Sequence, residues 1–390
     1  MRYLSAGESR GPSLTAIIEG LPAGFTLYSE DINHQLWRRQ QGYGRGARMK
    51  IEKDRVEILS GLRFNKTLGT PLTLQIKNRD WDNWQQKMAP EGKAPASLEA
   101  MLRPRPGHAD LAGGFKYNHT DLRNVLERTS ARETAIRVAV GTVGRLLLGK
   151  FNIKIFSHVV RIGNVSSAFD INSLPENYQV VENSPLRCFD PELEKTMIEE
   201  IDKAADEGDS LGGIIELLVT GLPPGLGSYS HPEHRLDALL AGALMGIQAI
   251  KAVEIGAGFS AASTRGSELH DPIVKGTDGR ITRTSNRAGG LEGGVTNGMP
   301  VVIRVAMKPI PTLARPLPSV DWQTGKIAPG ATERSDVCAV PAAAVVAEAV
   351  AAWELAEAFR KKFSGDFMEE VEAAYRFYID KVEEKLKGKK

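Results

Sequence analysis

Two segments of the chain, 239–250 and 340–352, are almost continuously apolar. A membrane-spanning helix needs about 20 consecutive apolar residues, so both are too short to cross a bilayer. Apolar residues cover most of the helical circumference in these regions, which predicts helices buried between other layers of structure. In a chain of 390 residues this pattern favours an α+β fold of packed helical and sheet layers.

The remaining periodicities predict the other elements. Alternating or continuous apolar residues predict a hairpin over 49–58 and strands at 71–76, 153–162, 213–219 and 301–307. Helical spacing predicts helices at 129–148, 233–251, 341–362 and 366–387. Four prolines between 82 and 106 predict a long irregular loop with a short helix at 97–102.

We expect residues 1–390 to form a single large domain, because neither a repeat nor a clear linker divides the chain. Residues 166–210 carry twelve acidic and three basic residues, which predicts an acidic outer helical segment ended by Gly208. Residues 364–390 are expected to contribute a C-terminal helix that packs on the core or on another subunit.

Composition limits the possible classes of protein. A hydrophobic fraction of 42% and a charged fraction of 25% are typical of globular proteins and exclude disorder as the main state. A net charge of +2 and few aromatic residues argue against nucleic acid or a membrane as partner. Two cysteines and the lack of a signal-peptide pattern predict a cytoplasmic protein. His231 and His234 lack the spacing of a metal site, so no metal is expected.

Arginine and glycine residues cluster in two early segments. Arg39, Arg45 and Arg48 alternate with glycines, and an arginine fork beside a glycine turn is suited to binding carboxylate or phosphate. Arg105 and His108 lie in a proline-stiffened loop, where a histidine can act as a general acid or base. A solvated basic loop and a structural histidine are the alternative interpretations.

Three later segments have similar features. Ser130 and Arg132 lie at a predicted helix start, where backbone amides favour phosphate, although a simple helix cap is the alternative. A glycine-rich stretch at 289–298 precedes Lys308, with spacing that fits neither common nucleotide-binding motif. A charged tripeptide, 334–336, precedes the alanine-rich helix.

Taken together in order, these segments resemble the chorismate synthase family over essentially the whole chain. The resemblance rests on Gly-Glu-Ser-Arg-Gly-Pro at 7–12, Arg39 to Arg45, Arg-Pro-Gly-His-Ala-Asp at 105–110, Glu127 to Thr134, Gly293-Gly294, Lys-Pro-Ile-Pro-Thr at 308–312, and Arg-Ser-Asp at 334–336 with Glu348. The resemblance implies a β-α-β layered sandwich. It also implies a lyase that removes phosphate and a ring hydrogen from 5-enolpyruvylshikimate 3-phosphate to give chorismate.

The resemblance further implies a site for reduced FMN, which the reaction requires without net redox change. FMN would lie against Ser130, Ala131, Arg132, Gln248, Ala249, Gly293, Lys308, Pro309, Ile310, Pro311, Thr312 and Arg334. Substrate anions, or NADP, would meet Arg39, Arg45, Arg48 and Arg105, and Arg132 would also meet substrate anions. His108 would adjust the protonation of the flavin, and Asp336 would act as a base for the ring hydrogen through the flavin N5 atom.

One position departs from the family pattern. Arg10 stands where the family has a histidine that protonates the departing phosphate. An arginine keeps its proton near neutral pH, so we expect Arg10 to bind the phosphate but to slow the step that needs a proton.

The resemblance implies a homotetramer. Because no nicotinamide fingerprint is present, we expect NADPH to act only indirectly, through an external flavin reductase. Two alternatives stay open at this point. One is an NADPH-dependent flavin reductase, although no nicotinamide fingerprint is present. The other is an anion- or RNA-binding protein built on the arginine loops.

Overall fold

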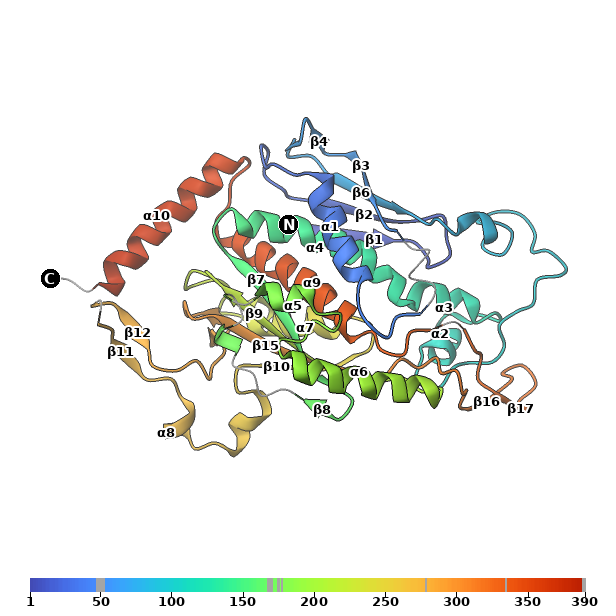
Figure 1. The fold of residues 1–390 in the computed structure, drawn as a ribbon. Helices are drawn as coiled ribbons and strands as arrows, with labels where there is room; N and C mark the ends of the chain where they lie inside the picture. The colour runs from blue at the N-terminus through green and yellow to red at the C-terminus, as the bar shows by residue number, and fades with distance from the viewer. Residues whose placement is uncertain are drawn as a thin grey trace.

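A layer of helices separates two antiparallel sheets in the computed structural model, which describes residues 1–46, 53–166, 171–173, 176, 178–277, 279–333 and 335–387 (Figure 1). The first sheet has the order β1-β2-β6-β3, with β1 (Arg2–Ala6), β2 (Ser13–Glu19), β6 (Leu72–Lys77) and β3 (Val56–Ser60). The second has the order β10-β15-β9-β7-β8, with β10 (Ile250–Ile255), β15 (Val301–Met307), β9 (Gly213–Thr220), β7 (Lys154–Ile162) and β8 (Val165–Ser166). This arrangement confirms the predicted α+β class and the β-α-β sandwich.

The helical layer consists mainly of α1 (Ser29–Gln40), α4 (Thr134–Gly149) and α9 (Val340–Lys362), with α7 (Leu236–Met245) packed on α9. Helix α9 has sheet or helix on every side, which explains why its sequence is apolar around the circumference. Helices α4 and α9 approach closely at Gly141, where an added Cβ would lie 2.1 Å from the carbonyl oxygen of Ala349. One large hydrophobic cluster joins this layer to both sheets.

Shorter elements surround the sandwich. The strands are β4 (Leu62–Arg63), β5 (Lys66–Thr67), β11 (Ile273–Lys275), β12 (Ile281–Arg283), β13 (Leu291–Glu292), β14 (Val295–Thr296), β16 (Pro318–Val320) and β17 (Ile327–Pro329). The α-helices are α2 (Asp110–Tyr117), α3 (Arg123–Thr129), α5 (Tyr178–Asn183), α6 (Pro191–Asp206), α8 (Gly266–Leu269) and α10 (Met368–Leu386). The 3-10 turns are η2 (Trp81–Asn83), η3 (Ala131–Glu133), η4 (Ile171–Ser173), η5 (Pro232–His234) and η6 (Gly258–Ser263).

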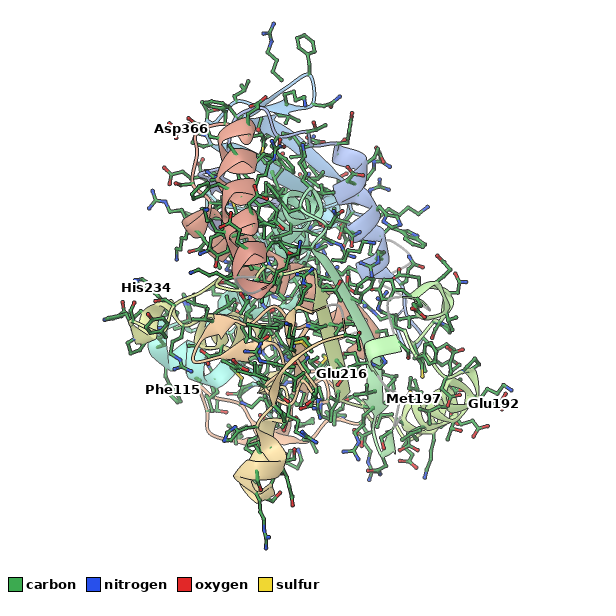
Figure 2. All side chains as sticks on the ribbon, turned by 90° about the vertical axis from the view of Figure 1, so that its left-hand side faces the viewer. Phe115, Glu192, Met197, Glu216, His234 and Asp366 are labelled. Carbon is green, nitrogen blue, oxygen red and sulfur yellow. The ribbon has the colours of Figure 1, made fainter. Side chains whose placement is uncertain are left out.

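Helix α6 belongs to the acidic segment predicted to be an outer layer. Asp190 caps its N-terminus by accepting hydrogen bonds from the amides of Glu192 and Leu193, and Pro191 occupies the first turn. Met197 and Ile201 are buried, whereas Glu192 lies at the outer margin of the molecule in Figure 2. The C-terminal helix α10 packs its first half on the core through Met368, Val371 and Tyr375, and its far end lies near the β11–β12 hairpin (Figure 1).

Several predicted elements have different boundaries. The predicted helix over 129–148 begins instead at Thr134, after the short turn η3. The predicted helix over 233–251 is divided into η5, α7 and the first residues of β10. The short helix predicted at 97–102 is wrong, because those residues form the end of a turn and irregular chain.

The predicted hairpin over 49–58 falls partly outside the described residues, and its second strand, β3, pairs with β6. The strands predicted at 71–76, 153–162, 213–219 and 301–307 correspond to β6, β7, β9 and β15, and the last two predicted helices to α9 and α10. Of the helices in the described part of the chain, none combines the length and apolarity needed to span a membrane.

Candidate active site

A cavity of about 680 Å³ lies where the loop ends of the helical layer meet the second sheet. Its wall combines the β1–β2 loop, the end of α1, the turn before α2, the start of α4 and the α7–β10 junction. Two further segments, within 307–312 and 333–339, complete it. Segments that are far apart in sequence therefore contribute to one site, and a cavity of this size accommodates a small organic ligand.

Most of the predicted site residues line this cavity. They are Arg10, Arg39, Arg45, Arg105, His108, Ser130, Ala131, Arg132, Gln248, Ala249, Lys308, Ile310, Pro311, Thr312 and Asp336. Pro309 is not among the lining residues, and Gly293 lies in the exposed turn between β13 and β14. Arg48 and Arg334 lie outside the described residues.

The cavity is strongly cationic. Among the described residues that line it, nine are arginine or lysine and three are aspartate or glutamate. The chain as a whole has a net charge of only +2, so the positive charge is concentrated here. A partly enclosed site with this excess of positive charge favours a ligand with several negative charges.

A hydrogen-bonded group at the cavity wall fixes His108. The Nδ1 atom of His108 lies 2.6 Å from Oδ1 of Asp110, and Arg105 Nε donates to Oδ2 of the same carboxylate at 2.8 Å. Burial alone would raise the pKa of Asp110, but the hydrogen bonds from His108 and Arg105 outweigh it and hold the pKa well below its usual value. Arg105 Nη2 also lies 3.0 Å from Nδ1, so the tautomer is assigned from the shorter contact: the ionised Asp110 favours a proton on Nδ1 of the neutral ring, which leaves Nε2 as the acceptor nitrogen.

The local chain explains this arrangement. Gly107 has φ +79°, a left-handed conformation that favours glycine, and it turns the chain so that His108 follows directly. Lys308 reaches this turn from the end of β15 and donates a hydrogen bond to the carbonyl oxygen of Gly107. Arg105 also donates from Nη1 to the hydroxyl of Thr312 at 2.9 Å. The predicted Arg105 and 308–312 motifs therefore form one continuous part of the wall.

Asp336 is held by two groups of the glycine-rich segment after α1. Arg45 Nε lies 2.9 Å from Asp336 Oδ2, and the amide of Gly46 donates to Oδ1 at 2.6 Å. The Asp336 side chain is 20% exposed, so it retains access to the cavity while its orientation is fixed.

Arg39 and Arg132 are more deeply buried than the prediction of a ligand contact suggested. Arg132 pairs with Asp54, and Nη1 of Arg39 lies 3.9 Å from the same carboxylate. Arg39 also donates from Nε to the hydroxyl of Thr134 at 2.9 Å. The neighbouring Arg38 lies outside the cavity wall and pairs with the buried Glu348.

Arg10 lies between two carboxylates and an aromatic ring. Its Nη1 donates to Glu127 at 2.9 Å and its Nη2 to Glu333 at 2.6 Å, while the guanidinium carbon lies 4.2 Å from the centroid of the Trp84 ring. Burial would lower the pKa of Arg10, but Glu127 and Glu333 outweigh it and raise the pKa above its usual value. Arg10 is therefore a permanent positive charge in this site.

Sequence reasoning did not single out several residues of the wall. Arg137 and Lys251 add two cations, and Glu133 links Arg137 to Gln248 through hydrogen bonds of 3.1 and 3.2 Å. Arg137 is at helical spacing from Glu133, which is the only sequence signal for this link. Ser9 and Glu333 adjoin the predicted motifs at Arg10 and Arg334 and could have been included on that ground.

The fold and the cationic cavity, with a histidine–carboxylate pair in its wall, define an enzyme that acts on a small polyanion. The family model described as chorismate synthase matches residues 1–359. A chorismate synthase of Desulforudis audaxviator is 56% identical over 98% of each chain, and one of Trichlorobacter lovleyi is 56% identical over 95% of this chain and 96% of its own. A crystal structure of a chorismate synthase is similar with a TM-score of 0.79 and 45% identity, covering 98% of each chain.

The chain belongs to the chorismate synthase family. It is a carbon–oxygen lyase that acts on a phosphate ester, eliminating phosphate from 5-enolpyruvylshikimate 3-phosphate to give chorismate in the shikimate pathway of aromatic amino-acid biosynthesis. The alternatives of a flavin reductase and of an anion- or RNA-binding protein are not favoured.

Proposed function

We propose that the 680 Å³ cavity is the active site for this elimination and that it holds reduced FMN and the phosphorylated substrate together. The charge of the wall supports this proposal most strongly, since nine lining residues are cationic and three are acidic. The substrate has a phosphate and two carboxylates, and FMN adds a second phosphate. Clustered positive charge compensates these groups where burial strengthens each charge-assisted hydrogen bond.

We assign the substrate anions to Arg39, Arg45 and Arg105, with Arg48 as a further candidate outside the described residues. The Arg45 side chain is 10% exposed, and it points its Nε to Asp336. Its Nη1 also donates to the carbonyl oxygen of Arg39 at 3.4 Å, so the guanidinium is fixed in the cavity wall, where a carboxylate or phosphate can approach it. Arg39 and Arg105 are held by hydroxyl groups of Thr134 and Thr312, which fix their orientation before a ligand arrives.

The lining residues fit FMN as a cofactor. The Oε1 atom of Gln248 is a buried acceptor that has no hydrogen-bond partner among the described residues, and a flavin N–H group supplies the missing donor. Lys308 and Arg132 supply positive charge, and Ser130, Ala131, Ala249, Ile310, Pro311 and Thr312 complete the proposed site. When bound, reduced FMN would supply the electron that assists cleavage of the carbon–oxygen bond, with no net redox change.

We assign proton movement to two side chains. Asp336 accepts the ring hydrogen as a proton, since Arg45 and the Gly46 amide hold the carboxylate in a fixed position. His108 exchanges a proton at Nε2, because its Nδ1 atom is occupied by Asp110. Arg10 neutralises the departing phosphate by charge and hydrogen bonding, without giving up a proton.

The assembly and its setting are also proposals. Leu4 and Ile17 are paired across β1 and β2 and are 75% and 48% exposed, which supports burial of this sheet face in a homotetramer. Cys188 and Cys338 are free thiols, which supports a cytoplasmic location.

We further propose that residues 1–390 act as one domain. NADPH would supply electrons only through an external flavin reductase.

Titration of the protein with FMN under anaerobic reduction, followed by flavin fluorescence or absorbance, tests the cofactor assignment. We expect Lys308→Ala and Gln248→Ala to weaken binding about tenfold each, since each removes a polar partner in an enclosed site. Lys195→Ala, at an exposed position on α6, is the matched control and should bind as the wild type does. Equal FMN binding by all variants would contradict the cofactor assignment.

A separate assay tests the need for an external reductase. Oxidation of NADPH by the purified protein with FMN alone would contradict that need.

A further inference from the structure

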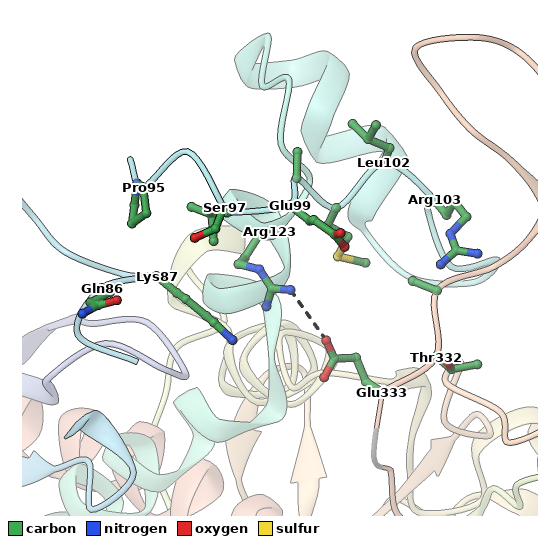
Figure 3. A pocket seen from close by; sticks show the side chains of 14 residues that line it. Gln86, Lys87, Pro95, Ser97, Glu99, Leu102, Arg103, Arg123, Thr332 and Glu333 are labelled. Atoms are coloured by element: carbon green, nitrogen blue, oxygen red, sulfur yellow. Dashed lines mark ion pairs between the residues drawn. The ribbon is translucent and has the colours of Figure 1, made fainter. Parts of the chain in front are cut away.

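Glu333 stands in the wall between two cavities. It lines the 680 Å³ cavity and also a second cavity of about 420 Å³ formed by residues 86–103, Arg123 and residues 331–333. Figure 3 shows the second cavity, with the Glu333 side chain at its edge and directed toward Arg123. A single carboxylate therefore contacts both spaces.

On the side of the first cavity, Glu333 neutralises Arg10. Its Oε2 accepts from Arg10 Nη2 at 2.6 Å, and its side chain is 25% exposed. The second carboxylate on Arg10, that of Glu127, is fully buried and also accepts from Arg123 Nη1 at 3.3 Å. Of these two carboxylates, Glu333 is the one that an incoming anion can displace. Glu333 is partly exposed, whereas displacing Glu127 would separate a fully buried carboxylate from Arg10.

On the side of the second cavity, other cations are available to Glu333. Arg123 Nη2 already lies 4.0 Å from Glu333 Oε1, and Lys87 and Arg103 line the same space (Figure 3). A Glu333 side chain that leaves Arg10 would therefore remain among positive charges. Both positions of the carboxylate are compensated, so the exchange between them costs little free energy.

We propose that Glu333 is an exchangeable counter-ion that occupies the Arg10 anion position until the phosphate group of the substrate replaces it, after which Glu333 pairs with Arg123 and the cations of the second cavity. This inference rests on the proposed placement of substrate in the first cavity. Glu333 sets the affinity for the anion, since every ligand phosphate must compete with it for Arg10. Removing the charge of Glu333 therefore tightens phosphate binding.

Titration calorimetry with inorganic phosphate, on the full chain at low ionic strength, tests this proposal. We expect Glu333→Gln to bind phosphate about fivefold or more tightly than the wild type. Glu333→Asp, which keeps the charge, should lie close to the wild type. The matched control is Glu99→Gln, an exposed carboxylate that lines the second cavity. It should leave the affinity unchanged.

Trp84 provides a second measurement, because its ring stacks on Arg10. Phosphate should change tryptophan emission in the wild type, and the change should be lost in Trp84→Phe. Equal or weaker phosphate binding by Glu333→Gln, the same gain in Glu99→Gln, or no binding by either protein would overturn the proposal.

The two proposals fail separately. Phosphate binding needs neither flavin nor turnover, so tighter binding by Glu333→Gln would stand even if the purified protein made no chorismate in this cavity. A wild type that forms chorismate, together with a Glu333→Gln variant of unchanged phosphate affinity, would refute the role of Glu333 alone.

Discussion

The Nδ1 atom of His108 lies 2.6 Å from Oδ1 of Asp110, and this contact sets which ring nitrogen is available to a ligand. Asp110 is a positioning residue, since its side chain is fully buried behind the histidine. We expect His108→Ala to lower kcat by about a hundredfold and Asp110→Asn by about tenfold. In Asp110→Asn, KM should rise as well, because Arg105 loses the ionised partner of its Nε and Nη2 groups.

Steady-state assays with reduced FMN measure both parameters. Asp237→Asn, which changes an acidic residue paired with Arg235 outside the cavity wall, is the control and should keep the wild-type values. Full activity in His108→Ala would show that the role assigned to this residue is wrong.

Asp336 should be required for loss of the ring hydrogen. Asp336→Asn keeps an oxygen for the Gly46 amide but cannot take up a proton, so we expect kcat to fall by about a hundredfold. FMN binding, measured by flavin fluorescence, should be retained within about twofold, because the carboxylate is assigned to proton transfer. An Asp336→Asn enzyme with full turnover would refute the assignment.

Arg10→His should raise turnover. Glu127 and Glu333 raise the pKa of Arg10, which makes proton donation to the departing phosphate still less favourable than for a free arginine. A histidine at this position can donate a proton near neutral pH, and we expect a severalfold gain in kcat with reduced FMN. Arg10→Lys, which keeps the charge, is the control and should show no gain. If Arg10→His turns over no faster than the wild type, the explanation of this departure from the family fails.

Glu348 should be essential for stability. Burial alone would raise its pKa, but Arg38, Arg145 and Arg187 together hold the pKa well below the usual value for glutamate. Glu348→Gln leaves three arginines without their shared carboxylate, and we expect a loss of about 3–5 kcal/mol in the free energy of unfolding. Denaturant unfolding measures this loss, and Glu192→Gln, at a side chain that is 82% exposed, should cost under about 1 kcal/mol.

The pH dependence provides an independent check. A carboxyl group with a lowered pKa in the folded state stabilises above its unfolded pKa and loses this contribution as the pH falls. Glu348→Gln should therefore be less sensitive than the wild type to acidification below the ordinary glutamate pKa. Equal stability of the variant and the wild type at neutral pH would contradict the role of this buried network.

Ionisation of Glu354 should lower the stability of the folded protein, whereas ionisation of Glu348 raises it. Burial, with Glu357 as the next contribution, raises the pKa of Glu354 from 4.5 to about 7. Between these values the folded state holds a proton that the unfolded state has lost, so stability falls as the pH rises. We expect Glu354→Gln to raise Tm at pH 8 and to leave it unchanged near pH 4.5, as measured by calorimetry. Glu384→Gln, at an exposed position, should show no such difference, and a lower Tm for Glu354→Gln at pH 8 would contradict the shift.

Some parts of the fold could be predicted from local pattern. The strand β15 was predicted with its observed bounds, because six of the seven residues of Val301–Met307 are apolar and the run follows a glycine-rich stretch. The region 233–251 was predicted as one helix, although Gly246 ends α7 and Ala249 has φ +69° before β10 begins. An apolar run does not distinguish a buried helix from a buried strand, so this boundary depends on the sheet that receives it.

The site shows the same division between local and non-local information. Arg45 and His108 could be predicted from short motifs that carry their own chemistry, whereas Asp336 was assigned a role through the family resemblance. The partners of Arg10 could not, because Glu127 and Glu333 are 117 and 323 residues away in sequence. Such partners are determined by how the layers pack, and a pattern within one segment contains no information about them.

The central claim is that one cavity carries out a phosphate elimination without net redox change. Anaerobic incubation with photoreduced FMN and 5-enolpyruvylshikimate 3-phosphate, with chorismate and phosphate followed together, tests it most directly. We predict that both products appear in equal amounts over many turnovers while the flavin is still reduced at the end, and that Asp336→Asn slows the formation of both about a hundredfold. Release of phosphate without chorismate, or oxidation of one flavin for each product formed, would contradict the claim.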